Sequence, residues 1–299
     1  MIALPQDLAD ALDDLASTDL RDAVGKLSDA YRVGKPTAVS SFDDAAAYAV
    51  YRAPATFAAV SAVLRALPPF APASFLDAGA GPGTATWAAS EVFASIEQVT
   101  CVETNAHMRA VGERLRPGLS WREVVDGPAD LVIASYAVGE GSLDVDELWE
   151  HTNQALVLIE PGTPRGFAMV LDARTKLLER GAHVAAPCPH DGACPMRPPA
   201  WCHFAQRLPR APLHRMLKDA SLPYEDEKFS YVALMRGEVA DRPARIVDHP
   251  RYRRHLVELS LCTPDGLRKR AVPRSDPSYK VARKLEWGDA FSEAPRTTP

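Results

Sequence analysis

Four cysteines have the residue type and the placement needed to hold a metal centre. Cys188, Cys194 and Cys202 lie within the stretch APCPHDGACPMRPPAWCHF, and Cys262 ends an apolar, strand-like run, HLVELSLC, sixty residues further on. Thiolates are soft ligands, and sites with four of them hold zinc or an iron–sulfur cluster. The chain therefore predicts one site that is closed by ligands from two distant segments.

The spacing of these cysteines favours an iron–sulfur cluster over zinc. Structural zinc sites use tight loops with about two to four residues between paired cysteines. Here five residues separate Cys188 from Cys194, and seven separate Cys194 from Cys202. A proline follows both Cys188 and Cys194, as it follows a cysteine in ferredoxin-type sequences. Zinc remains an alternative because His190 and His203 lie nearby, and a further alternative is four buried cysteines that hold no metal.

A glycine loop forms a second candidate site. The run Asp77-Ala-Gly79-Ala-Gly81-Pro-Gly83 follows a short apolar strand and precedes a helical stretch. Glycines permit a sharp turn and the close approach of a ligand to the backbone. A dinucleotide-binding turn would need a third small residue where this chain has Thr84. The spacing instead resembles the first motif of S-adenosylmethionine-dependent methyltransferases, and the alternative is a tight turn in an unrelated α/β fold.

This resemblance implies roles for the residues around the loop. Asp77 would help to position the methionine end of the cofactor. Glu103, which ends the next strand in CVETN, would accept hydrogen bonds from both ribose hydroxyls. Asn105 and Met108 would flank the cofactor or the helix cap. The expected cofactor-binding residues are Asp77, Gly79, Gly81, Gly83 and Glu103.

The sequence assigns no catalytic residue. Amino-methylating enzymes often place an Asn-Pro-Pro-Tyr type motif after the third long strand, where this chain has Ala134-Ser135-Tyr136-Ala137. Tyr136 would either stack on a base or pack in the core, and we favour packing. Methyl transfer depends mostly on positioning a reactive sulfonium, so it does not require a general base.

Strands and helices alternate around these two candidate sites, which predicts an α/β fold with a parallel sheet and crossover helices. Helices are expected over 4–31, 43–67, 166–181 and 212–222, and a basic helix over 278–291. KFSYVALMRG is expected to belong to an antiparallel pair at the sheet edge. We predict a helical N-terminal region over 1–67, a Rossmann-like methyltransferase domain over 68–240 with a Cys-rich insertion at 187–204, and a small basic β-rich domain over 241–299.

Composition indicates a globular protein in a reducing compartment. Hydrophobic residues make up 46% and charged residues 24% of 299 residues, which is ordinary for a soluble protein. Five cysteines are too few for a secreted disulfide framework. We see no apolar run of the roughly 20 residues that a membrane helix needs, and the acidic start MIALPQDLADALDDLAS does not resemble a targeting peptide. We therefore expect a cytoplasmic monomer without a membrane partner.

Charge is unevenly distributed along the chain. The formal net charge is −5, yet twelve Arg and Lys face four acids between Arg242 and Lys284, which gives this region +8. Such a region suits a phosphate backbone, and the alternative is an Arg-rich surface that only contacts solvent. The cations expected to bind RNA are Arg253, Arg254, Arg268 and Lys269.

The combined motifs resemble the Rsm22 family of mitochondrial small-ribosomal-subunit methyltransferase-like proteins and their bacterial relatives. The matching segments run through nearly the whole chain: AYAVYRAPATFAAV, LDAGAGPGTATWAA, DLVIASYAVGE, LVLIEPGTPRGF, CPHDGACPM, WCHF, LCTPDG and ARKLEWGD. The resemblance implies a methyltransferase fold with S-adenosylmethionine as cofactor. It also implies a [4Fe–4S] cluster on the four cysteines, and a partner in the small ribosomal subunit and its RNA. The family has no recognisable amino-methylation motif after the third strand.

Three functional interpretations follow. The chain is a methyltransferase that acts on small-subunit ribosomal RNA, or a non-catalytic assembly factor that binds this RNA. The third interpretation, which has less support, is an iron–sulfur redox or sensing protein. We expect the cluster to be structural, because its ligands would join the Cys-rich insertion to the C-terminal β-rich region.

Overall fold

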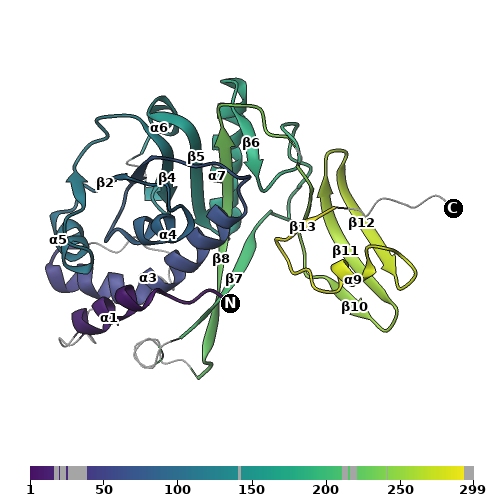
Figure 1. Ribbon diagram of the computed structural model, residues 1–299, viewed down its shortest axis with the longest axis horizontal. Helices are drawn as coiled ribbons and strands as arrows, with labels where there is room; N and C mark the ends of the chain where they lie inside the picture. The colour runs from purple at the N-terminus through teal and green to yellow at the C-terminus, as the bar shows by residue number, and fades with distance from the viewer. Residues whose placement is uncertain are drawn as a thin grey trace.

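Two β-sheets of unequal size organise the protein, as the computed structural model shows (Figure 1). The residues that the structure describes are 1–16, 20, 25, 39–140, 143–210, 215, 221–240 and 242–292. Within them, eight strands form the first sheet, in the order β3-β2-β1-β4-β5-β8-β6 with β7 also paired to β8. Five strands form the second sheet, and they all come from the last fifth of the chain.

The first sheet has five parallel strands and an antiparallel closing group. The parallel strands are β1 (Ser74–Ala78), β2 (Gln98–Val102), β3 (Ser120–Arg122), β4 (Ala129–Ser135) and β5 (Thr152–Pro161). β8 (Tyr224–Met235) runs antiparallel to β5, and it pairs with β6 (His183–Ala186) and β7 (Phe204–Pro209). Successive strands are added on one side of β1 up to β3 and then on its other side from β4, so the strand order reverses between β1 and β4. Ligands of such sheets bind at this switch point, beside the carboxyl ends of the strands.

Helices cover both faces of the first sheet. One hydrophobic cluster joins the sheet to α1 (Gln6–Leu15), α3 (Phe42–Arg65), α4 (Thr84–Val92) and α5 (Ala106–Leu115). A second cluster joins the other face to α6 (Val145–Glu150) and α7 (Pro164–Glu179), and a short 3-10 turn, Val138–Glu140, follows β4. The predicted Rossmann-like α/β fold is confirmed, and the N-terminal helices share the core of the first sheet.

The N-terminal helix expectations are met in part. Leu8, Leu12 and Leu15 of α1 lie on one buried stripe, whereas most of the remaining stretch to residue 38 lies outside the described residues. The helix expected over 212–222 also lies mostly outside them.

Helix α3 corrects the expectation that no apolar run is long enough to cross a membrane. By length and composition it is such a helix, because alanines raise its mean hydropathy to 1.2. However, 72% of the apolar stretch of α3 is buried inside the protein, as in the core helix of a soluble protein.

The second sheet has a hydrophobic core of its own. Its strands are β9 (Ala244–Ile246), β10 (Arg251–Arg253), β11 (Leu256–Thr263), β12 (Gly266–Pro273) and β13 (Ala290–Phe291). The basic helix expected over 278–291 is wrong in extent, since α9 covers only Tyr279–Ala282. The chain then turns at Gly288, where φ is 96°, and β13 pairs with β9. Pairing of the chain end with the sheet replaces the expected helix.

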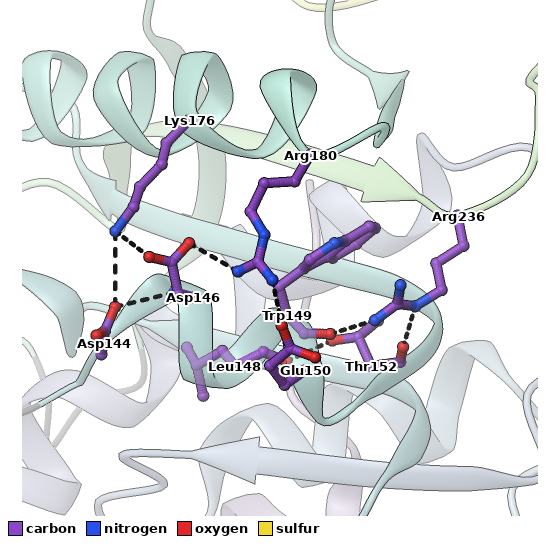
Figure 2. Close-up of polar contacts among 9 residues, drawn as sticks. All are labelled: Asp144, Asp146, Leu148, Trp149, Glu150, Thr152, Lys176, Arg180 and Arg236. Atoms are coloured by element: carbon purple, nitrogen blue, oxygen red, sulfur yellow. Dashed lines mark hydrogen bonds and ion pairs between the residues drawn. The ribbon is translucent and has the colours of Figure 1, made fainter.

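Ion pairs fix α6 against α7 on the surface of the first sheet (Figure 2). Asp146 of α6 lies 2.5 Å from the ammonium of Lys176 on α7, and 3.0 Å from the guanidinium of Arg180, the C-cap residue of α7. Arg236 donates to the carbonyl of Trp149 at 2.6 Å, and its guanidinium lies 4.5 Å from the Trp149 ring. Exposed ion pairs contribute little to stability, but these pairs join α6 to α7, and Arg174 of α7 lies at the four-cysteine region.

The start of α7 supplies a test of this packing. A Cβ on Gly166 would lie 2.1 Å from the carbonyl oxygen of Pro161, which is backbone and cannot rotate away. We therefore expect Gly166→Ala to lower the free energy of unfolding by about 1–3 kcal/mol through overpacking. Gly127→Ala is the control, because nothing lies within 4 Å of its Cβ position. Equal urea unfolding midpoints for the two variants would contradict the packing.

Candidate cofactor loop and four-cysteine site

The glycine loop turns through three left-handed residues. Gly79, Gly81 and Gly83 have φ values of 67°, 53° and 80°, which strain any residue with a Cβ. A Cβ on Gly79 would also lie 2.5 Å from the Cβ of Ala137, which follows β4. The loop therefore connects β1 to α4 at the switch point, directly against the segment after β4.

Glu103 joins this loop to the end of β2. Its Oε2 accepts a hydrogen bond from the Gly81 amide at 2.9 Å, and its Oε1 accepts one from the Asn105 amide at 2.8 Å. Each carboxylate oxygen keeps a further lone pair for a ligand. Asn105 caps α5, since its side chain accepts from the amides of His107 and Met108. Met108 is buried in the core of the first sheet.

Asp77 is a fully buried carboxylic acid below the loop. Its Oδ2 accepts a hydrogen bond from the Thr86 hydroxyl at 3.2 Å, whereas its Oδ1 is buried and has no partner among the described residues. Burial raises the pKa of Asp77 to about 7, and the hydrogen bonds from Thr86 oppose that rise. The site therefore contains an acceptor that the protein itself does not satisfy.

Tyr136 lies in a buried polar network at the end of β4. It adopts a left-handed conformation, with φ 60°, and its hydroxyl donates to Glu227 at 2.9 Å. Glu227 also accepts from Arg52 of α3 at 2.9 Å, and the Arg52 guanidinium lies 5.4 Å from the Tyr136 ring. Neither Arg52 nor Glu227 was predicted from the sequence. The available signal was an arginine inside the alanine-rich apolar stretch of α3.

The four predicted ligand cysteines line one cavity between the two sheets. Cys188 follows β6, Cys194 lies in the loop after it, Cys202 precedes β7, and Cys262 lies on β11 of the second sheet. The cavity has a volume of about 40 Å³, and its other walls are mostly apolar. Segments far apart in the sequence thus bring four sulfur atoms to one place. Cys101 lies elsewhere, buried in β2.

The thiols resist ionisation in this cavity. Burial raises the pKa of Cys188 and Cys202, and it raises that of Cys262 to about 12. The cysteines oppose one another's ionisation as well, so thiolates would need nearby positive charge. Across the described ranges, no group of three or more His, Cys, Asp or Glu side chains could hold a single metal ion.

The two histidines considered as zinc ligands differ in their placement. His190 Nε2 lies 3.9 Å from the Cys262 sulfur, at the site. The His203 ring instead stacks on Trp201 with the ring centroids 5.1 Å apart, and its Nδ1 lies 3.3 Å from the Trp201 carbonyl.

The basic residues of the second sheet lie on both of its faces. Directly paired residues share a face, and the register pairs Arg253 with Leu256 and Lys269 with Ser260. These cations are therefore on the face that carries Cys262. Arg254 lies in the turn after β10, and Arg268 is on the opposite face, where it donates to Asp265 at 2.6 Å. The predicted RNA-binding cations thus do not form one patch.

Comparison with known proteins gives the family. A family model described as mitochondrial small ribosomal subunit Rsm22 matches residues 42–292. The chain belongs to the Rsm22 family. It is 31% identical to the human "Ribosome assembly protein METTL17, mitochondrial", over 81% of this chain and 61% of that protein. It is 29% identical to the Schizosaccharomyces pombe "Rsm22-cox11 tandem protein 2, mitochondrial", over 72% of this chain and 38% of that protein.

This Rsm22-family chain thus spans about three-fifths of the human relative and less than two-fifths of the yeast one. Similar solved structures include magnesium protoporphyrin IX methyltransferase from Synechocystis PCC 6803, with TM-score 0.37 and 15% identity over 79% of this chain and all of that one. Another is the ribosomal protein L11 methylase from Lactobacillus delbrueckii subsp. bulgaricus, with TM-score 0.36 and 12% identity over 58% of this chain and 76% of that one.

The buried acid of the cofactor loop predicts a pH dependence of stability. The pKa of Asp77 is about 7 when folded and near 3.8 when unfolded, so the folded protein binds more protons between these values. The contribution of Asp77 to stability is therefore fully present below about pH 4 and is lost as the pH rises through about 7, by at most about 4 kcal/mol. Asp77→Asn should remove this loss. Between about pH 5 and pH 8, the free energy of unfolding of the wild type, measured in urea, should therefore fall relative to that of the variant.

Asp130→Asn is the control for this measurement. Backbone hydrogen bonds from Ala73 and Ser74 oppose the effect of desolvation and lower the pKa of Asp130, so its contribution should be constant over the same pH range. A difference in unfolding free energy between wild type and Asp77→Asn that does not change with pH would contradict the burial of this acid.

Proposed function

We propose that this chain is a small-ribosomal-subunit assembly protein that binds ribosomal RNA and S-adenosylmethionine, and that a four-cysteine [4Fe–4S] centre joins its two sheets. The observation that carries the proposal is the meeting of Cys262, from the second sheet, with Cys188, Cys194 and Cys202 at one cavity. The ribosomal partner is supported by the family and by the name of the human relative.

The donor set fits an iron–sulfur cluster. Four thiols line the cavity, its other walls are mostly apolar, and the buried guanidinium of Arg174 is among them. A single zinc ion would need all four sulfurs about 2.3 Å from one point, and the described residues contain no group suited to one ion. A cluster would supply a separate iron corner for each thiolate. When bound, it would join the Cys-rich segment to β11.

The glycine loop fits a cofactor with a sugar and a cationic end. Gly81 has nothing within 4 Å of its Cβ position, so a ligand can approach the backbone there. The unsatisfied Oδ1 of Asp77 and the remaining lone pairs of Glu103 supply acceptors on either side. S-adenosylmethionine would supply an activated methyl group at this place. The protein would orient this methyl group and exclude water from it.

The segment after β4 favours an assembly protein that does not transfer a methyl group. Tyr136 occupies the place of the amino-methylation motif, and its hydroxyl is bonded to Glu227. Ala137 packs against Gly79, so the space beside the loop is partly filled. The alternative is an active RNA methyltransferase. Loss of a specific methyl mark from small-subunit RNA on deletion of the gene, restored by wild type and not by Gly81→Arg, would establish that alternative.

The cluster is expected to stabilise the union of the two sheets. Ligation at a structural metal site contributes on the order of 10 kcal/mol to folding. We expect anaerobically purified protein to contain iron and sulfide, and Cys262→Ser to lose most of both. Protease cleavage should then rise in the second sheet before it rises in the first. Cys101→Ser is the matched control, because this thiol is buried in β2 outside the cavity. Colourless wild-type protein with stoichiometric zinc would refute the cluster.

One face of the second sheet is expected to bind RNA. Lys269→Glu and Arg268→Glu change the same charge at neighbouring residues that lie on opposite faces. If the face that carries Cys262 contacts phosphates, Lys269→Glu should weaken binding to a small-subunit RNA fragment and lower the salt dependence by about one phosphate contact. Arg253→Glu should do the same, and Arg268→Glu should have little effect. Equal losses for Lys269→Glu and Arg268→Glu would refute this choice of face.

A further inference from the structure

Two buried arginines beside the cysteines have no carboxylate partner. Arg174 of α7 is 4% exposed and Arg245 of β9 is 7% exposed. Within the described part of the chain, neither forms an ion pair with an acid, and both use their donors on backbone carbonyls. A buried charge is costly unless an opposite charge accompanies it. The two guanidinium groups therefore require a negative partner that the described side chains do not supply.

The carbonyl bonds hold these arginines at the cavity. Arg174 Nη2 donates to the carbonyls of His190 and Gly192 at 2.9 and 2.8 Å, in the loop between Cys188 and Cys194. Its Nε is buried and has no acceptor among the described residues, although the residue lines the cavity with all four cysteines. A charged donor without an acceptor thus lies where the proposed centre would be.

Arg245 approaches the same cavity from the second sheet. It is paired in register with Cys262, so both residues lie on the same face of that sheet. Its Nε donates to the carbonyl of Pro187, next to Cys188, at 3.2 Å, and its Nη1 donates to the carbonyl of Gly288 at 3.0 Å. One positive charge therefore comes from each side of the junction between the sheets.

We propose that Arg174 and Arg245 are the counter-charge of the anionic centre held by the four cysteines, and that they set its reduction potential. This inference rests on the proposed iron–sulfur centre. Four thiolates around a [4Fe–4S] core with two positive charges carry two negative charges in total. Reduction adds one electron and exchanges no proton or ligand, which gives three. Nearby cations stabilise the more negative state more strongly, so they raise the potential.

The experiment separates the effect of the arginine charge from the effect of the side-chain shape. It uses the full chain, purified without oxygen. Arg174→Gln and Arg245→Gln remove the charge, and Arg174→Lys and Arg245→Lys keep it. The readouts are iron and sulfide per chain, circular dichroism, and the midpoint potential from a dye-mediated titration. Each Gln variant should change the equilibrium constant for reduction about tenfold, a shift of about 59 mV to lower potential for one electron. The Lys variants should shift it by less than half as much.

Arg180→Gln is the matched control, because Arg180 is an arginine at the end of α7, its C-cap residue, that pairs with Asp146 at the surface (Figure 2). It should leave the potential unchanged. Gln variants that lose the cluster while the Lys variants keep it also support the counter-charge. Gln variants that keep both the cluster and the wild-type potential overturn it. Folded Gln and Lys variants that all lose the cluster overturn it too, because the arginines would then act through shape alone.

The two proposals fail in different ways. A wild-type protein that holds no iron and sulfide overturns both the centre and its counter-charge. A wild-type protein with a normal cluster whose potential does not respond to either arginine overturns the counter-charge only.

Discussion

Charge compensation in the cavity between the sheets is the constraint on which the junction of the two sheets depends. Four thiols and Arg174 line it, and Arg245 lies beside it, paired with Cys262 and bonded to the Pro187 carbonyl. Burial opposes ionisation of the thiols, and among the described residues neither arginine pairs with an acid. Thiols alone would therefore leave an excess of buried positive charge. A centre that converts them to bound thiolates would remove both costs at once.

The two sheets hold this cavity through different elements. Helix α7 is fixed to the first sheet by buried residues such as Val170 and Leu177, and to α6 by surface ion pairs. From that position Arg174 holds the loop between Cys188 and Cys194. On the other side, β9 and β11 carry Arg245 and Cys262 from a sheet with its own core. The cavity therefore depends on packing in two separate cores.

Local sequence patterns predicted the parts of the structure that depend on neighbouring residues. Alternating strands and helices gave the parallel sheet, and glycine spacing gave the turn after β1, because both follow from short-range geometry. Long-range pairs were not accessible in this way. Arg52 and Glu227 are 175 residues apart, and no periodicity connects them. Arg268 and Lys269 were grouped by charge, although the two-residue period of a strand places them on opposite faces.

Continuity along β11 links the cavity to the candidate RNA surface. Cys262 lies at one end of this strand, and Arg251 and Arg253 of β10 pair with the other end, on the same face. β11 is one continuous strand of eight residues that pairs with β9, β10 and β12. Release of Cys262 would therefore move the whole basic face relative to the first sheet, while the glycine loop, on the distant β1, would keep its own contacts. The position of the candidate RNA surface thus depends on the same strand that closes the four-cysteine cavity.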